Sequence, residues 1–457
     1  MKLEVNIDML KKYSRPGPRY TSYPTAPHFS SAFREEDYRK EIEESNRNPN
    51  LPLSLYFHLP FCKTLCYYCG CNMMITHSSK KIDDYIDWLE KEMALLAPLI
   101  HPERKVSQLH WGGGSPDYLS PEQIERLFHR ITKYFSFCSE SEIGIEIDPR
   151  RLTETHLSTI RRLGFNRISF GVQDFDEKVQ KAVNRIQSEE LTRRVVEEAR
   201  ELGFHSINLD LIYGLPYQTL ESYQRTLEKI LQLSPDRLAV FHYAHVPWLK
   251  KHQKMIPQEA LPSTEEKLKM VKMIIETLTS AGYVYIGMDH FAKEDDPLTK
   301  ALREKSLHRN FQGYTTFRGA EIYGFGITSI SQLQNAYIQN VKLIPPYQGK
   351  LEKGKLPVAL GRRLTKDDQI RRYVIIELMC NSLVQKRDVE NRFGISFDSY
   401  FAKDLPKLEE FIKDGLVQER KDSILVTEAG RLVIRNIAMC FDAYLKNNQE
   451  NMYSKTI

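Results

Sequence analysis

Four of the seven cysteines lie within one short segment, at positions 62, 66, 69 and 71. The spacing of Cys62, Cys66 and Cys69 lets three thiolates from one tight loop converge on a small inorganic cluster, as in iron–sulfur proteins. A structural zinc site would instead need four ligands, usually in two pairs separated by a longer spacer. If only three cysteines ligate a four-iron cluster, one iron keeps an open position for a ligand with nitrogen and oxygen donors. The spacing therefore favours an iron–sulfur site, with a structural zinc knuckle as the alternative.

A glycine-rich segment, Gly112-Gly113-Gly114-Ser115-Pro116, follows an apolar run that is typical of a strand. Three glycines let the backbone approach a ligand closely, and we expect them to leave amide groups free to donate hydrogen bonds to it. The segment is neither a P-loop nor a dinucleotide-binding fingerprint. Taken alone, it also fits a simple tight turn.

Polar side chains stand at the ends of successive strand-like runs. The runs begin at Leu53, Val106, Glu142, Arg167, Ile207 and Arg237. The cysteine segment follows the first run and the glycine segment follows the second. The polar residues at the ends of the other four are Glu146 and Asp148, Gln173 and Asp174, Asp210, and His242 and Tyr243. Any one carboxylate could be a helix N-cap. Because parallel α/β folds build their sites at the carboxyl ends of strands, the coincidence across six runs predicts one shared site.

Helical segments separate these runs, which predicts six β-then-α units and a parallel sheet between residues 53 and 290. Ser120 and Ser263 are expected N-caps of two of these helices. Gly164, Gly203 and Gly282 each follow a helical run, where a C-terminal glycine belongs. Periodicity alone does not distinguish an open doubly wound sheet from a partial barrel.

The two ends of the chain differ from this pattern. Residues 15–24, RPGPRYTSYP, cannot form a helix interior, and a surface arm or linker is favoured over an arm folded across a site. Residues 342–355 are rich in proline, glycine and lysine and predict a boundary loop. From Gly361 the chain is mostly helical, and a helix ending at Gly415 before two short strands looks like a winged helix. Residues 361–457 hold 17 Lys and Arg against 15 Asp and Glu, so a packing or lid role is favoured over DNA binding.

The composition is that of an ordinary globular protein. The 457 residues are 41% hydrophobic and 27% charged, with a net charge of +5 and a mean hydropathy of −0.47. We find no apolar run long enough to cross a membrane and no signal-peptide core. Clustered, odd-numbered cysteines indicate a reducing compartment rather than a disulfide framework. Cys138, Cys380 and Cys440 are isolated and are expected to be small buried apolar residues.

The cysteine motif after a first strand and the glycine motif after a second resemble the radical S-adenosylmethionine (SAM) superfamily. The longer match is to its oxygen-independent coproporphyrinogen III oxidase family, and it extends from about residue 15 to near residue 445. The segments that carry this resemblance are GPRYTSYP from Gly17, SLYFHLPFCKTLCYYCGCN from Ser54, HWGGGSP from His110, EIDPR from Glu146, GVQDF from Gly171, NLDLIYGLP from Asn208, MDHFA from Met288 and HRNFQGYTT from His308.

The resemblance implies an α/β fold, a partial (β/α)6 TIM-type barrel with an N-terminal arm and a mostly helical, winged-helix-like C-terminal domain. The implied division is residues 1–50 for the arm, 51–345 for the catalytic barrel and 346–457 for the C-terminal domain. It also implies oxidative decarboxylation of two propionates of coproporphyrinogen III to vinyl groups in haem biosynthesis. The cofactors would be a [4Fe–4S] cluster and two SAM molecules.

The resemblance also implies roles for individual residues. Cys62, Cys66 and Cys69 match the cluster ligands. Tyr56, Gly113 and Glu146 match contacts of a first SAM. The matches to contacts of a second SAM are Gly114, Ser115, Gln173, Arg185, Asp210, Ala244 and Ile330. Ser115 stands where threonine is commoner, and keeps the hydroxyl. Glu146 and Cys71 are the expected catalytic residues, and Cys71 matches a family cysteine that is not a cluster ligand.

The expected partners are coproporphyrinogen III and an electron donor such as a flavodoxin or ferredoxin, for a cytoplasmic monomer without nucleic-acid binding or membrane insertion. Arg19 and Arg309, each among aromatic residues, are expected to pair with substrate carboxylates. Two alternatives stay open. A related haem chaperone usually lacks Cys71 and the GPRYTSYP arm, both present here. A zinc-stapled nucleic-acid binder would use the C-terminal domain.

Overall fold

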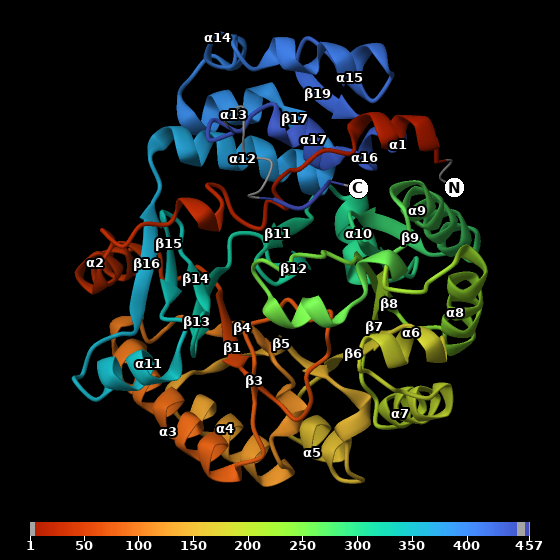
Figure 1. Ribbon diagram of the computed structural model, residues 1–457. Coiled ribbons are helices and arrows are strands. Elements are labelled where there is room, and N and C mark those ends of the chain that lie inside the picture. Colours follow the sequence, from red (N-terminus) through yellow and green to blue (C-terminus); the bar gives the residue numbers. More distant parts are fainter. Residues whose placement is uncertain (1–4, 446–452, 457) are drawn as a thin grey trace.

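The computed structural model describes residues 5–445 and 453–456 (Figure 1). One large sheet dominates the described part of the chain, with the strand order β16-β15-β14-β13-β1-β4-β5-β6-β7-β8-β10-β9. The strands from β13 to β8 are parallel, and those outside them are antiparallel. The parallel strands are β13 (Glu321–Phe325), β1 (Leu53–Leu59), β4 (Val106–Gly113), β5 (Phe137–Ile147), β6 (Arg167–Gln173), β7 (Ser206–Tyr213) and β8 (Arg237–His242).

All six predicted strands form and lie side by side in chain order. The sheet is open, because its end strands β16 and β9 are not paired with each other. Figure 1 shows the strands around a central space with helices outside them, as predicted for a partial barrel. The antiparallel strands are β9 (Val284–Gly287), β10 (His290–Ala292), β14 (Ile330–Gln332), β15 (Ala336–Asn340) and β16 (Val358–Arg363).

Several helices that follow the barrel strands start and stop where the sequence predicts. Ser120 and Ser263 cap α4 and α9, each accepting a hydrogen bond from a backbone amide in the first turn. Gly164, Gly203 and Gly282 have positive φ just after a helix. The helices up to β10 are α1 (Ile7–Tyr13), α2 (Glu35–Ser45), α3 (Ser79–Leu96), α4 (Pro121–Tyr134), α5 (His156–Arg162), α6 (Glu177–Ala182), α7 (Glu189–Glu201), α8 (Leu220–Leu233) and α9 (Thr264–Ser280).

The N-terminal arm is buried, so the favoured interpretation as a surface linker is wrong. Tyr20 and Tyr23 are 1% and 0% exposed. The Tyr20 hydroxyl donates to Asp442, and Arg435 of the C-terminal region donates to the carbonyl oxygens of Gly17 and Pro18. Figure 1 shows the arm in red between the barrel and the upper, blue helices. Three prolines and two tyrosines suit an extended segment that fills an interface. Composition alone could not show what the segment packs against.

The expected boundary loop contains a helix, α11 (Ile344–Leu351), which corrects that prediction. Its two prolines occupy the first turn, where the backbone amides have no intrahelical acceptor, so proline costs little there. The large sheet also continues to Arg363 at the end of β16, past the predicted division at residue 345.

The C-terminal region contains the predicted helix and hairpin. Helix α15 (Glu409–Lys413) ends before Gly415, and β18 (Val417–Glu419) pairs antiparallel with β19 (Ser423–Val426). A third strand, β17 (Leu383–Gln385), joins β19; the winged-helix likeness remains a prediction. The other helices are α10 (Pro297–Arg303), α12 (Lys366–Asn381), α13 (Lys386–Phe393), α14 (Phe397–Tyr400), α16 (Glu428–Arg431) and α17 (Ile434–Met439). Among the described residues, no helix combines the length and apolar character needed to span a membrane.

Candidate active site

A cavity of about 190 Å³ opens at the carboxyl ends of the parallel strands, and we call it the cysteine cavity. It lies where the loops after β1, β4 and β5 meet residues of β6 and β7 and the segment after α6. The predicted site residues that line it are Cys62, Cys66, Cys69, Cys71, Gly113, Gly114, Ser115, Glu146, Gln173, Arg185 and Asp210. Three predicted residues, Tyr56, Ala244 and Ile330, are not among its lining. The fold therefore brings most of the expected site into one place.

The glycine segment packs against the backbone that leads into the cysteine loop. The Gly114 amide donates to the Leu59 carbonyl at 2.9 Å, and the Ser115 amide donates to the Phe61 carbonyl at 2.9 Å. A Cβ on Gly114 would lie 2.7 Å from the carbonyl carbon of Pro60. The expectation that these amides are free for a ligand is therefore wrong. Glycine is needed here because two backbone segments touch.

Glu146, at the end of β5, is held by two donors. The Gly113 amide donates to its Oε2 at 3.2 Å, and its Oε1 lies 3.2 Å from His110 Nε2. Burial alone would raise the pKa of Glu146, but His110 and the Gly113 amide lower it below its ordinary value. A Cβ on Gly112 would lie 2.8 Å from Oε1. The carboxylate thus stays ionised in a niche that the glycines leave open.

An ionic network joins the cysteine loop to the loops after β5 and β6. Arg150 Nη2 lies 2.7 Å from Asp148 Oδ2, and Arg185 Nη1 lies 3.3 Å from the same oxygen. The same two arginines approach Cys66 Sγ, at 3.6 Å and 3.8 Å. Burial opposes ionisation of Asp148, but Arg185 and Arg150 keep the pKa of Asp148 well below its ordinary range. Two cations facing Cys66 make this side of the cavity suitable for an anionic cluster.

Asp210 is a buried carboxylate with a raised pKa. Ser169 Oγ donates to its Oδ2 at 3.0 Å, and Asn208 Nδ2 donates to its Oδ1 at 2.7 Å. Burial, with a smaller contribution from the charge of Glu146, raises the pKa of Asp210 from 3.8 to about 6. The folded cavity therefore holds an acid that is mostly ionised at pH 7 and becomes protonated as the pH falls through about 6.

This pKa predicts a pH-dependent cost to folding. Because the folded state binds the Asp210 proton more tightly than the unfolded chain, Asp210 adds stability at low pH that is lost as the pH rises through about 6. Asp210→Asn should raise the free energy of unfolding of the cluster-free protein, by about 1.5 kcal/mol more at pH 8 than at pH 5. Urea denaturation under reducing conditions at both pH values measures this difference. Asp295→Asn, at an exposed carboxylate, is the control, and an equal gain from Asp210→Asn at both pH values would contradict the prediction.

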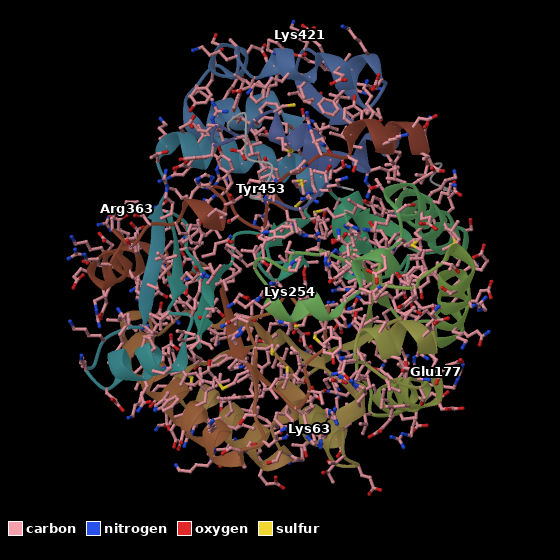
Figure 2. All side chains as sticks on the ribbon, in the orientation of Figure 1. Lys63, Glu177, Lys254, Arg363, Lys421 and Tyr453 are labelled. Carbon is pink, nitrogen blue, oxygen red and sulfur yellow. The ribbon has the colours of Figure 1, made fainter. Side chains whose placement is uncertain are left out.

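The cysteine loop is also held from its outer side. The Cys71 thiol donates to Cys69, which lowers the pKa of Cys69 and raises that of Cys71. The carbonyl oxygen of Cys71 accepts from Lys250 Nζ at 2.9 Å, and that of Cys69 lies 2.7 Å from His252 Nε2. Figure 2 shows Lys254, in the same segment, in front of the barrel. Residues after β8 thus close the cysteine loop from outside.

The other three predicted residues lie on nearby strands or loops. The Tyr56 ring stacks on His110 with centroids 6.2 Å apart, and its hydroxyl lies 3.2 Å from His58 Nδ1. Ala244 follows β8, and its carbonyl accepts from Gln253 Nε2 at 3.2 Å. Ile330 begins β14 and packs against a small apolar cluster. Their predicted contacts with SAM remain predictions.

Comparisons with known proteins agree with this geometry. Residues 56–230 match the radical SAM superfamily and residues 364–433 match the HemN C-terminal domain. The chain is 48% identical to the oxygen-independent coproporphyrinogen III oxidase of Synechocystis over 100% of its length and 98% of that protein. It belongs to the oxygen-independent coproporphyrinogen III oxidase family. It is also 47% identical to the Escherichia coli K12 relative, over 97% of this chain and 96% of that one. The solved structure of E. coli HemN, described as a radical SAM enzyme, matches with a TM-score of 0.93, 46% identity and coverage of 97% and 100%.

The donor set of this family member fits a [4Fe–4S] cluster. Within residues 5–445 and 453–456, no three His, Cys, Asp or Glu side chains converge where one metal ion could bind them all. A four-iron cluster differs, because each cysteine ligates a different iron. The cavity also fits SAM: Gln173 Oε1 and Arg185 Nε are buried there without a hydrogen-bond partner among the described residues. Buried polar atoms of this kind need a partner, which a bound ligand can supply.

Several residues near this site were not singled out by sequence reasoning. The cysteine loop is contacted by Arg150, Lys250 and His252, which are distant from it in sequence. Asp117 accepts a hydrogen bond from the Ser115 hydroxyl at 2.7 Å. Arg150 lies inside the EIDPR segment and could have been noticed there. Cys138 is half-exposed, which corrects its expected burial, whereas Cys380 and Cys440 are buried as expected.

Proposed function

We propose that this chain converts coproporphyrinogen III to protoporphyrinogen IX without oxygen, by decarboxylating two propionates to vinyl groups. Each conversion removes a hydrogen atom from the propionate β-carbon and releases CO2 and one electron. The observation that carries the proposal is the meeting of three cysteines, the glycine segment and Glu146 in one cavity of a chain of this family.

Cys62, Cys66 and Cys69 would ligate the [4Fe–4S] cluster and leave one iron open to SAM. When bound, the cluster and SAM supply the 5′-deoxyadenosyl radical that takes the hydrogen atom. The residues proposed to hold a first SAM are Tyr56, Gly113 and Glu146. Those proposed to hold a second are Gly114, Ser115, Gln173, Arg185, Asp210, Ala244 and Ile330.

The charges in the cysteine cavity suit these roles. Glu146, ionised and held by Gly113 and His110, can accept hydrogen bonds from an ammonium group or hold a proton close to the substrate. Arg185 is fixed by Asp148, so its unpartnered Nε is preorganised to donate to a ligand oxygen. Cys71 places a thiol in the same cavity, where it can transfer a proton or hydrogen atom at its sulfur. The buried arm and the C-terminal helices help exclude water and oxygen from the barrel.

The remaining proposals concern the electron donor, the oligomeric state and the compartment. An external donor such as a flavodoxin or ferredoxin would supply the electron that the cluster needs. We further propose that the protein acts as a monomer in the cytoplasm, where a reducing environment preserves the thiolates.

The test is an anaerobic turnover assay. The protein would be reconstituted with iron and sulfide, then mixed with SAM, a reductant and coproporphyrinogen III. We expect chromatography to show protoporphyrinogen IX, read as protoporphyrin after oxidation, together with 5′-deoxyadenosine. Deoxyadenosine without the porphyrin would contradict the proposed substrate. Neither product, with iron incorporated, would contradict the proposed reaction.

A further inference from the structure

Exposed apolar side chains gather around the cysteine loop, residues 62–71. Among the described residues, eight large hydrophobic side chains are exposed, and five of them lie on three segments that contact this loop. These side chains are between 40% and 71% exposed. The five are Ile75, Ile186, Trp248, Leu249 and Met255. An exposed apolar residue that stands alone is ordinary, but several around one loop indicate an interaction site.

Two of these residues lie on short segments that are bonded to the cysteine loop. Ile75 pairs with Cys62 in a small two-stranded sheet. Ile186 follows shortly after Asn184, whose side-chain amide donates to the Leu65 carbonyl oxygen at 2.8 Å. Both apolar side chains therefore stand beside the loop that carries the proposed cluster ligands.

The other three belong to residues 244–260, which follow β8 and so lie at the carboxyl ends of the strands. Figure 1 shows this segment in light green, across the front of the central space of the barrel. Within it, His252 Nε2 lies 2.7 Å from the Cys69 carbonyl oxygen. One hydrogen bond therefore separates a proposed cluster ligand from a segment that carries three exposed apolar side chains.

The exposed apolar residues have an excess of positive charge beside them. Residues 61–78 and 244–260 together hold four lysines and one acidic residue, Glu259. Lys250 donates to a carbonyl oxygen rather than to a carboxylate. The helix before Ile186, α6 with its N-cap, holds two acidic and two basic residues and leaves the excess unchanged. The four lysines are Lys63, Lys250, Lys251 and Lys254.

We propose that the five apolar residues and the four lysines, together the docking face, bind a small acidic electron-carrier protein whose redox group lies at its own surface. This inference rests on the proposed function, because the bound cluster needs one electron from outside for each SAM that is cleaved. The reduced carrier loses that electron, and the site formed by Cys62, Cys66 and Cys69 accepts it. No atom is transferred, so no other reactant is needed.

The position and chemistry of the docking face suit such a carrier. Electron transfer between proteins weakens steeply with distance, so a carrier must bind close to the cluster ligands, and this face contacts their loop directly. Opposite charges speed the encounter, and redox complexes bury only a small interface. An apolar centre with a charged rim is the usual anatomy of such a surface. A second copy of this chain would instead bring the same lysines face to face, which costs free energy.

The test measures the binding of a bacterial flavodoxin, an acidic FMN protein, to the reconstituted holoenzyme by calorimetry. One variant carries Lys251→Glu and Lys254→Glu, and another carries Trp248→Ala and Leu249→Ala. All four side chains are exposed, so the fold should survive. We expect each variant to lose roughly 10-fold or more in affinity for flavodoxin. Added salt should weaken binding to the wild type.

Two substitutions in the C-terminal region serve as controls. Lys421→Glu reverses the charge of an exposed lysine, which Figure 2 shows at the opposite end of the molecule from Lys63. Ile412→Ala removes an exposed apolar side chain from α15. Neither control should change the affinity for flavodoxin. Equal weakening by the controls, or no saturable binding to the wild type, would overturn the docking face.

A second readout is turnover with two sources of electrons. Dithionite is a small reductant that needs no docking, so both variants should keep wild-type turnover with dithionite. With reduced flavodoxin they should need roughly 10-fold more carrier to reach half of the maximal rate.

Three results would contradict the assignment in different ways. Equal losses with dithionite and flavodoxin would place these residues on the path of the substrate and overturn the docking face. A wild-type dimer that dissociates in the variants, seen by sedimentation, would assign the face to a second copy and overturn it as well. A wild-type holoenzyme that makes no protoporphyrinogen with dithionite would instead overturn the proposed function, whatever its affinity for flavodoxin.

Discussion

Cys66→Ala should abolish iron–sulfur cluster binding and reduce protoporphyrinogen formation to the background of the assay. Cys66 lines the cysteine cavity, and Arg150 and Arg185 both direct guanidinium nitrogens at its sulfur. Alanine removes one of three proposed thiolate ligands, while Arg150 and Arg185 keep their ion pairs with Asp148. Iron and sulfide content, the visible absorption of the reconstituted protein and the anaerobic turnover assay measure the result.

Two other cysteines provide matched comparisons for this experiment. Cys138→Ala, on β5 outside the cavity, should leave iron content and turnover unchanged, because the hydrogen bond recorded there uses its backbone carbonyl. Cys71→Ala should keep the iron and lose at least about 100-fold in turnover, since Cys71 is proposed to act on substrate rather than to ligate iron. Loss of iron from the Cys71 variant, or its retention in the Cys66 variant, would contradict the assigned roles.

The barrel could be predicted because its local signals agree. Strands β1 and β4 are buried along nearly their whole length, and β6 and β7 alternate between buried and partly buried residues. Serine caps and glycine ends bracket the helices that follow them. The extension of the sheet through β14, β15 and β16 was not predicted. Strand β14 has only three residues, too few for its pattern to indicate a strand, and the three strands extend the sheet by antiparallel pairing on one side of the barrel. The burial of the arm could not be predicted because its partners Asp442 and Arg435 lie some 420 residues away in the sequence.

The site could be predicted in outline for a geometric reason: side chains at the carboxyl ends of adjacent parallel strands must meet at one edge. Glu146, Gln173 and Asp210 follow this rule and line the cysteine cavity. The rule gives no information about hydrogen-bond partners. It therefore could not show that the Gly114 and Ser115 amides are already bonded to the backbone before the cysteine loop.

That backbone contact predicts a severe effect for Gly114→Ala. A Cβ at this position would lie 2.7 Å from the carbonyl carbon of Pro60 and 2.8 Å from the carbonyl oxygen of Phe61. Both atoms belong to the backbone and cannot move aside as a side chain would. The glycine segment and the backbone at Pro60 and Phe61 must therefore separate. A shift of this kind moves the proposed SAM contacts relative to the cluster, and a displacement near 1 Å can cost about 100-fold in rate. We expect turnover to fall by about that factor, with weaker SAM binding and some loss of iron.

Gly349→Ala is the matched control, because it adds the same methyl group where nothing lies within 4 Å. Gly349 is inside α11, so alanine there should leave turnover unchanged and stabilise the protein by about 0.5–1 kcal/mol. Equilibrium SAM binding, iron content and thermal unfolding of both variants separate a local effect at the site from a loss of folding. If Gly114→Ala kept wild-type SAM affinity and turnover, the packing of the glycine segment against Pro60 and Phe61 could not be what positions the cysteine loop. A fall in turnover and in SAM affinity with the unfolding temperature preserved would place the damage at the site itself, which is where the contact predicts it.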